Sequence, residues 1–249
     1  MDIHISFQPE IIGIIFGMPI SNSLLLSVIT AFLVVVGGFL IVRSLKLVPE
    51  KTQSVVELIV EGILDFMNQI LQNKEQAKKF FTLIASIFLF ILFNNWIGIL
   101  PGIGSFGLFE GEEGNRVLVP LFRSANSDLN TTLAIALTSV IAVHWYAIQK
   151  LGLLAHASRF FNLTKGPIQF FVSILELISE FAKVISFSFR LFGNIFAGEV
   201  LLIIIMTLVP VFAPTPFLFL ELFVGFIQAL VFAVLTLVFL KVATETVKH

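Results

Sequence analysis

One arginine in the middle of a long apolar stretch limits the chemistry that this sequence can perform. Arg190 lies within SFSFRLFGNIFAGE, which runs from Ser186 to Glu199. A guanidinium group keeps its proton in proteins, so Arg190 is a permanent positive charge. A charge at the centre of a membrane helix costs about 2.5–3.5 kcal/mol on insertion scales, and such charges mark ion pathways or paired interiors. Arg190 is therefore the first candidate functional residue.

Other polar residues share one helical face with Arg190. At about 100° per residue, Lys183 lies about 20° and Ser186 about 40° from Arg190 around the helix. The whole face consists of Glu176, Ser179, Lys183, Ser186, Arg190 and Asn194. Glu199 lies at about 180° and is predicted to face the opposite way. The face either lines an ion path or holds helices together, with Lys183 paired to Glu180 or Glu176.

The last apolar segment supplies a second polar pair. Glu221 and Gln228 are seven residues apart and so share a helical face. Matching the two faces predicts that Glu221 approaches Glu199 and that Gln228 hydrogen-bonds the helix that carries Arg190. Arg190 itself has no acid within one turn of its own helix. We therefore expect its partner to come from another chain.

The composition indicates that these residues belong to a membrane protein. Of the 249 residues, 57% are hydrophobic and only 12% are charged, whereas soluble domains carry about 25% charged residues. The apolar residues form long blocks between short polar stretches, which is typical of multi-span helical membrane proteins. No stretch of about ten residues alternates with period two, which argues against a barrel. The absence of cysteine excludes disulfides and thiolate chemistry.

We expect an all-α membrane protein with a single domain, residues 1–249, and about five membrane-embedded helices. The predicted spans are 22–42, 80–100, 129–148, 168–209 and 216–246, after an N-terminal segment at 1–21. An amphipathic helix at 50–79 should lie on the membrane surface or against a partner rather than cross, because its apolar residues recur at helical spacing between carboxylates. If continuous, the last two segments would be about 63 Å and about 46 Å long, although the hydrocarbon core is only ~30 Å thick. They either break at a glycine or form a strongly tilted antiparallel hairpin, which we favour.

The distribution of basic residues predicts the orientation in the membrane. Eleven of them fall on one predicted side: Arg43, Lys46, Lys51, Lys74, Lys78, Lys79, Lys150, Arg159, Lys165, Lys241 and Lys248. Only Arg116 and Arg123 fall on the other side. Because positive residues concentrate in cytoplasmic loops, we expect the surface helix and the C-terminus in the cytoplasm and the N-terminus outside.

Few other motifs carry chemistry. His144 and His156 could bind a metal or a proton, but we favour an interfacial position beside Trp145 and Tyr146 in an aromatic belt. No GxxxxGK[ST] motif is present, so we expect the chain to bind no nucleotide. No basic stretch interleaved with aromatic residues indicates nucleic-acid binding.

Several segments together resemble subunit a of the F-type ATP synthases, the membrane stator beside the rotating c-ring. They are RLFGNIFAGE, ILELISEFAKVISFS, LFVGFIQALVFAVLTLVFLKVATE, NNWIGILPG and SANSDLNTTLAIALTS. The resemblance covers about Leu24 to the C-terminus. It implies a subunit that is not catalytic by itself, lies in an energy-transducing membrane such as the bacterial plasma membrane, and needs no cofactor. Its implied partners are the c-ring, the peripheral-stalk b subunits and the lipid bilayer.

The resemblance also implies a role for each polar residue. In the family, protons enter one aqueous half-channel, bind a c-ring carboxylate, travel almost a full turn and leave by a second half-channel. Arg190 matches the essential arginine between the half-channels, and Asn194 and Gln228 match the polar residues near it. The positions that match the cytoplasmic half-channel are Glu176, Ser179, Lys183 and Ser186. Those that match the outer half-channel are Asn94, Asp128, Asn130, Glu199 and Glu221.

Two features leave alternatives open. Many relatives carry a histidine at the position of Glu199 or Glu221, so the relay here would be a carboxylate pair or one carboxylate with water. The translocated ion is expected to be H⁺, with Na⁺ as the alternative. The residues themselves also fit two other functions. A self-contained secondary transporter would place an acid opposite Arg190 within this chain, and a scaffold would use the buried charges only to fix helix registry.

Overall fold

A computed structural model describes residues 9–15, 17–46, 51–100, 107–110, 117–160, 167–209 and 212–244. Its helices are α1 (Asn22–Ser44), α2 (Lys51–Leu71), α3 (Lys74–Ile99), α4 (Leu129–Leu151), α5 (Leu153–Phe160), α6 (Pro167–Leu208) and α7 (Pro214–Thr244), with a short 3₁₀ helix η2 (Ala125–Ser127) before α4. Among the described residues, five helices are long and apolar enough to cross a membrane: α1, α3, α4, α6 and α7. The predicted class, an all-α membrane protein, is confirmed.

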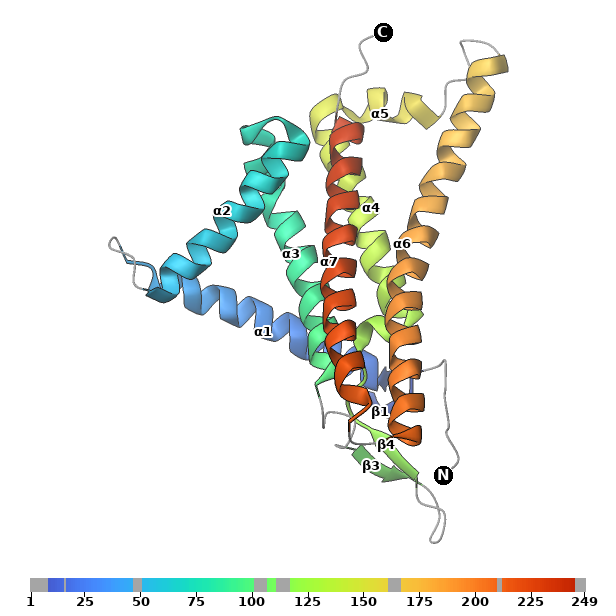
Figure 1. Ribbon diagram of the computed structural model, residues 1–249. Coiled ribbons are helices and arrows are strands. Elements are labelled where there is room, and N and C mark those ends of the chain that lie inside the picture. The colour runs from blue at the N-terminus through green and yellow to red at the C-terminus, as the bar shows by residue number, and fades with distance from the viewer. Residues whose placement is uncertain are drawn as a thin grey trace.

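The bundle forms around α3, α4, α6 and α7 (Figure 1). Helix α3 packs along α7, and α4 packs against both α6 and α7. The ring of Phe187 on α6 lies 4.8 Å from that of Phe232 and 5.5 Å from that of Phe239, both on α7. Van der Waals packing of this kind drives association between helices in lipid, where the hydrophobic effect contributes little.

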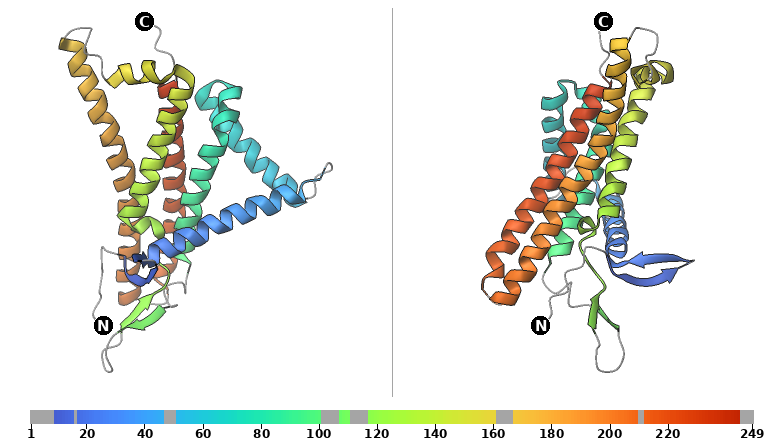
Figure 2. Two further views of the ribbon diagram at one scale, coloured as in Figure 1. Left: turned by 180° about the vertical axis from the view of Figure 1, so that it is seen from behind. Right: turned by 90° about the vertical axis from the view of Figure 1, so that its right-hand side faces the viewer.

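Helices α6 and α7 are unbroken and run antiparallel (Figures 1 and 2). They contain 42 and 31 residues, and each differs from its predicted bounds by only one or two residues at each end. Of the two expectations for these segments, the unbroken hairpin is therefore confirmed, and its tilt in the membrane stays a prediction. The first half of α6 diverges from α7 in both figures.

The predicted surface helix at 50–79 is wrong only in its last eight residues, 72–79. Helix α2 ends at Leu71, and residues 74–79 form the first turns of α3. Gln72 has a left-handed backbone (φ 55°), and the side chain of Asn73 accepts hydrogen bonds from the backbone N–H groups of Glu75 and Gln76. An asparagine in this position caps a new helix and satisfies its first free N–H groups.

Helix α1 leans away from the bundle, and α1, α2 and α3 form the sides of a triangle in Figure 1. The buried side chains of α1 all lie in its first nine residues, from Asn22 to Thr30. The rest of α1 exposes large apolar side chains such as Phe32, which is 66% exposed. Among the described residues, α1 therefore buries side chains against the rest of the chain only near its beginning.

The two ends of the bundle differ. One end, here called the strand end, carries η2 and two antiparallel hairpins that the sequence analysis did not predict (Figure 1). They pair β1 (Ile11–Ile15) with β2 (Met18–Ser21), and β3 (Gly107–Glu110) with β4 (Val117–Pro120). At the opposite end, here called the α5 end, Gly152 ends α4 with φ 86°, and α5 crosses the bundle. Glycine adopts this φ without strain.

Candidate functional site

Arg190 lies on the outside of the bundle. Its side chain is exposed on α6, and its neighbours Ile185 and Phe189 are 55% and 56% exposed. The buried face of α6 consists instead of Phe187, Leu191 and Ile195, which pack into the core. No carboxylate among the described residues forms an ion pair with Arg190. The guanidinium group thus lies on the exposed side of α6 without a countercharge in the described part of the chain.

The polar face predicted around Arg190 continues along α6. Ser179, Ser186 and Asn194 are exposed like Arg190, whereas Glu176 and Lys183 are half-buried. Gln228 on α7 is half-buried, and its side chain makes no hydrogen bond to α6 within the described residues. The predicted bond from Gln228 to the helix of Arg190 is therefore wrong.

At the α5 end, the polar face of α6 opens into a cavity of about 170 Å³ between α4, α5, α6 and α7. Glu176, Ser179 and Lys183 line it, but Ser186 does not. Lys183 Nζ donates to Glu180 Oε1 over 2.6 Å, so the predicted pairing of Lys183 with Glu180 is confirmed. The same ammonium group lies 4.7 Å from the centre of the Phe239 ring.

Two histidines and a further acid complete this cavity. Nδ1 of His144 lies 3.1 Å from Nε2 of His156, and Nε2 of His144 lies 3.6 Å from Glu180 Oε2. His156 is only 7% exposed. The contact between these histidines was not predicted from the sequence. Helix α5 was not predicted, and only its direction brings His156 back to α4.

At the strand end, two acids from α6 and α7 meet. Nε of Arg123 donates to both carboxylate oxygens of Glu199, over 3.0 and 3.3 Å. Glu221 is 6% exposed and lies close enough to Glu199 for their charges to interact, as matching the helical faces predicts. A Cβ atom at Gly198 would overlap the Glu221 carboxylate, so this glycine admits the acid of α7.

Arg123 was missed as a functional residue. It lies between β4 and η2, 76 residues before Glu199, and its only signal in the sequence is a basic residue on the sparsely charged side. The glycines of α6 also differ from one another. Gly198 contacts α7 of the same chain, whereas Gly193 has open space where a Cβ would lie.

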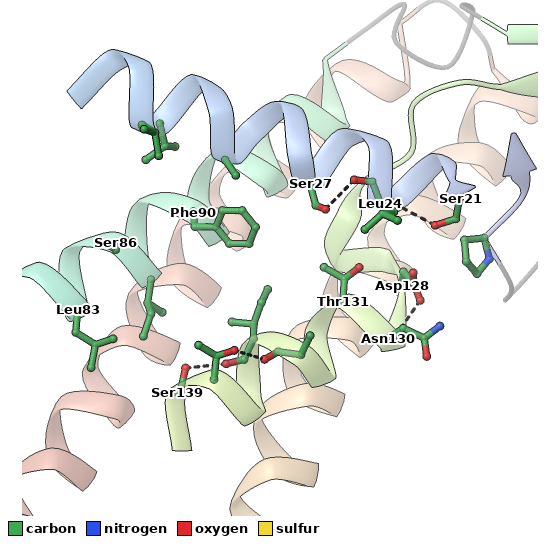
Figure 3. A pocket seen from close by; sticks show the side chains of 18 of the residues that line it. Ser21, Leu24, Ser27, Leu83, Ser86, Phe90, Asp128, Asn130, Thr131 and Ser139 are labelled. Atoms are coloured by element: carbon green, nitrogen blue, oxygen red, sulfur yellow. Dashed lines mark hydrogen bonds between the residues drawn. The ribbon is translucent and has the colours of Figure 1, made fainter. Parts of the chain in front are cut away.

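The other three predicted outer residues lie in different surroundings. Asp128 begins α4, where Oδ1 accepts from the backbone N–H of Asn130 (2.9 Å) and Oδ2 from Ser23 Oγ on α1 (2.8 Å). Asp128 and Asn130 line a cavity of about 920 Å³ between α1, α3 and α4, together with Ser27 and Thr131 (Figure 3). Neither Glu199 nor Glu221 belongs to its lining.

Asn94 is fully buried, and its side chain hydrogen-bonds neither to the Glu199–Glu221 pair nor to Asp128. Its Nδ2 donates to the Phe90 carbonyl over 3.0 Å, while its Oδ1 has no hydrogen-bond partner among the described residues. The predicted outer residues are thus separated into the Glu199–Glu221 pair, the Asp128–Asn130 pair at the large cavity, and Asn94 inside α3.

A buried network holds the strand end together. Nδ2 of Asn95 on α3 donates to the Gly225 carbonyl on α7 (2.9 Å), and Oδ1 of Asn95 accepts from Asn126 Nδ2 of η2 (2.7 Å). Trp96 Nε1 donates to the Leu222 carbonyl of α7 (3.1 Å). Buried amides paired in this way fix the relative positions of their helices. These hydrogen bonds therefore hold the segment that carries Arg123 close to Glu199 and Glu221.

The fold and the site define a multi-pass membrane protein with ionisable groups inside its spans, the kind of residue that marks ion pathways. The model of the ATP synthase A chain family matches residues 24–241, and the chain belongs to this family.

Curated relatives cover most of the chain. The ATP synthase subunit a of Campylobacter jejuni serotype O:23/36 is 32% identical over 219 residues, which cover 87% of each chain. That of Syntrophobacter fumaroxidans is 35% identical over 212 residues, covering 84% of this chain and 78% of the relative. That of Campylobacter curvus is 32% identical over 223 residues, or 89% of each chain.

Proposed function

We propose that this chain, as the membrane stator subunit of an F-type ATP synthase, passes protons to and from c-ring carboxylates through two offset aqueous half-channels that Arg190 separates. The observation that carries the proposal is the exposure of Arg190 on the outer face of α6, without an ion pair to any described carboxylate. A guanidinium group facing lipid is costly, by about 2.5–3.5 kcal/mol on insertion scales. A carboxylate on a neighbouring subunit removes this cost.

The fixed charge of Arg190 performs two tasks in this mechanism. It favours the ionised form of a rotor carboxylate that passes it, and so promotes release of the proton. It also repels a cation that would cross directly between the half-channels. A leak would dissipate about 2.3 kcal/mol per charge for each 100 mV of membrane potential, which is the energy that turns the rotor.

The two half-channels approach Arg190 from opposite ends of the bundle. Glu199 and Glu221 form the inner part of the outer half-channel, and Asn94, Asp128 and Asn130 contribute to its entrance region. Glu176, Ser179 and Lys183 line the cavity at the α5 end, and with Ser186 they form the cytoplasmic half-channel. Asn194 and Gln228 flank the passage at Arg190. This assignment places the α5 end in the cytoplasm and the N-terminus outside.

Within the complex, the Arg190 face contacts the c-ring, and the peripheral-stalk b subunits and lipids cover other surfaces. The chain carries H⁺, with Na⁺ as the alternative selected by the c subunit, and it uses no cofactor. It binds no nucleotide and is not catalytic by itself, so the formation of ATP belongs to other subunits.

Replacing Arg190 tests the proposal. The variant Arg190→Ala should assemble, judged by recovery of the c-ring with the purified complex, but make no ATP and pump no protons in inverted membrane vesicles. Arg43→Ala, which removes an exposed arginine at the end of α1, is the matched control and should remain coupled. Coupled pumping by Arg190→Ala would overturn the proposed function.

A crosslink tests the proposed contact. The chain contains no cysteine, so Asn194→Cys introduces its only thiol. A disulfide should form with a cysteine placed on the outer helix of a c subunit near its carboxylate. An equivalent thiol at Thr138, on the exposed side of α4, should form none. Equal crosslinking at both positions would contradict the contact.

A further inference from the structure

The histidine pair at the α5 end is not explained by the roles assigned above. His144 on α4 and His156 on α5 lie 3.1 Å apart between Nδ1 and Nε2, a hydrogen-bond distance. The second nitrogen of His144, Nε2, points to Glu180 Oε2 on α6 at 3.6 Å. Three proton-carrying groups from three helices, His156, His144 and Glu180, thus follow one another in a row in the lining of one cavity.

Imidazole suits proton transfer, because it accepts a proton at one nitrogen and releases one from the other, and its ordinary titration lies between pH 5 and 8. The cavity beside the row, about 170 Å³ in volume, has room for several water molecules. The distance of 3.6 Å between His144 and Glu180 exceeds a hydrogen bond. A small rotation of the carboxylate or one bridging water closes it.

We propose that His144 and His156 carry protons between cytoplasmic water and Glu180, as the outermost relay of the cytoplasmic half-channel. The proposal rests on the proposed function and adds residues to it. Glu180, held by Lys183 at 2.6 Å, is the inner end of this relay. From there, protons reach the exposed polar face of α6 that carries Ser186 and Arg190.

The inward transfer conserves protons and charge at each step. A hydronium ion protonates Nδ1 of His156 and becomes water, and the N–H at Nε2 of His156 gives its proton to Nδ1 of His144. His144 is then an imidazolium ion, and it releases the proton on Nε2 to Glu180 Oε2. His156 returns to neutrality, and His144 is left neutral with its proton on Nδ1. Exchange with water in the cavity restores the first tautomer, and the reverse sequence carries protons outward.

The described side chains around the row include charged groups on α6 and apolar groups on α7. On α6, the described groups with charge that line the cavity are Glu176, Glu180 and Lys183. Helix α7 contributes Phe239, Val242 and Ala243, which are apolar. Lys241 of α7 points elsewhere, because its Nζ donates to the Ile70 carbonyl over 2.9 Å. Among the described residues, the acidic and basic side chains that line the cavity with the histidines therefore come from α6.

A purely structural role for the pair is the competing explanation. Phe160 packs edge-on against both rings, with centroid distances of 5.9 Å to His144 and 5.5 Å to His156. The three rings could simply hold α5 on α4. A test must therefore separate proton transfer from packing.

The test measures passive proton conduction through the assembled membrane sector, in inverted vesicles from which the catalytic subunits have been removed. His144→Gln and His156→Gln should each slow conduction at least about tenfold, less than the 10²–10⁴ typical of a positioned proton-transfer group, because cavity water replaces part of the relay. The dependence of the rate on cytoplasmic-side pH between about 5 and 8 should become flatter. Adding imidazole buffer on that side should restore most of the rate.

Phe160→Leu is the matched control, because it removes the ring packing and keeps both histidines. It should conduct at the original rate and show no response to imidazole. If the histidine variants conduct normally, or if they are slow and imidazole does not restore them, the relay is overturned. Slow conduction by Phe160→Leu as well would also overturn it in favour of packing.

The relay and the proposed function fail in different ways. If Arg190→Ala remains coupled, the proposed function fails whatever the histidines do. If Arg190→Ala loses coupling while the histidine variants conduct normally, only the relay fails.

Discussion

Two arginines beside α6 occupy opposite situations. Arg123 has a side chain only 12% exposed and is bound to Glu199 of the same chain at 3.0 Å. Arg190 is exposed on the outer face of α6 and pairs with no carboxylate among the described residues. Folding of the chain itself therefore neutralises the charge of Arg123, whereas the charge of Arg190 is available to a neighbouring subunit.

The difference teaches how one helix serves two purposes. Arg190 and Glu199 are nine residues apart, so about 100° per residue places them on opposite sides of α6. One side of the helix is completed by its own chain, through Arg123, Glu221 and the glycine at 198. The other side is complete only when another subunit supplies an acid. The ion pair with Arg123 holds Glu199 in one position. Arg190, whose acid comes from another subunit, can pair with one rotor carboxylate after another.

The same substitution at both positions should have unequal effects. Arg190→Lys should lower ATP-driven proton pumping at least about tenfold, because a desolvated lysine can lose its proton and a lysine lacks the planar fork of arginine. Arg123→Lys keeps a charge beside Glu199, whose side chain is 28% exposed and partly solvated, so pumping should fall less than about threefold. Fluorescence quenching of a pH-sensitive dye in inverted vesicles measures both.

The informative quantity is the ratio of the two losses in proton pumping, that of Arg190→Lys to that of Arg123→Lys. Equal losses would remove the distinction between a fixed and an exchangeable partner. A larger loss for Arg123→Lys would reverse it and make Arg123 the more demanding position.

A double-mutant cycle sharpens the comparison further. Arg123→Gln leaves the half-buried Glu199 without its cation, and pumping should fall about three- to tenfold, which corresponds to about 0.7–1.4 kcal/mol. Adding Glu199→Gln should restore part of the thermal stability that Arg123→Gln loses, because no unpaired charge remains, whereas pumping should stay low because Glu199 belongs to the outer half-channel. The same addition to Arg190→Gln should restore nothing, because no described acid of this chain is the partner of Arg190.

Additive effects in the first cycle would mean that the Arg123–Glu199 contact contributes nothing measurable. Restoration in the second cycle would mean that Arg190 does act on Glu199 within the chain. Glu57→Gln, an exposed acid on α2, serves as the neutral control in both cycles.

The sequence predicted the parts of this arrangement that depend on one helix at a time. The favoured expectation for residues 168–209 was a continuous helix, and helical periodicity predicted that Glu199 faces away from Arg190. It also brought Glu221 towards Glu199, because both helices are long and antiparallel. These features follow from the 3.6-residue period alone.

What depends on tertiary position was not predictable from the sequence. The bond from Arg123 to Glu199 spans 76 residues and depends on the path between β4 and η2. The histidine pair depends on the turn at Gly152, and the break at Gln72 overrides a helical pattern that continues across it. Periodicity also misplaced Gln228, because a shared face does not specify which side chains come within bonding distance. The proposed proton path therefore combines predictable helix faces with contacts that only the packing determines.

The buried asparagines Asn95 and Asn126 stabilise the strand end, where Arg123 meets Glu199. Of the substitutions considered, Asn95→Ala should have the smallest effect on function. Asn95→Ala removes the bond to the Gly225 carbonyl and the acceptor of Asn126, at a cost of about 1–3 kcal/mol for the buried groups left unpaired. The midpoint of thermal dissociation of the detergent-solubilised complex should fall, whereas Asn68→Ala, a half-buried asparagine on α2, should leave it unchanged. ATP synthesis at 25 °C should stay within about twofold, because neither arginine loses its position while the bundle remains folded.

If Asn95→Ala is as heat-stable as Asn68→Ala, the strand end is held by packing rather than by these amides. A loss of synthesis without a loss of stability would instead place Asn95 in the proton path beside Glu221.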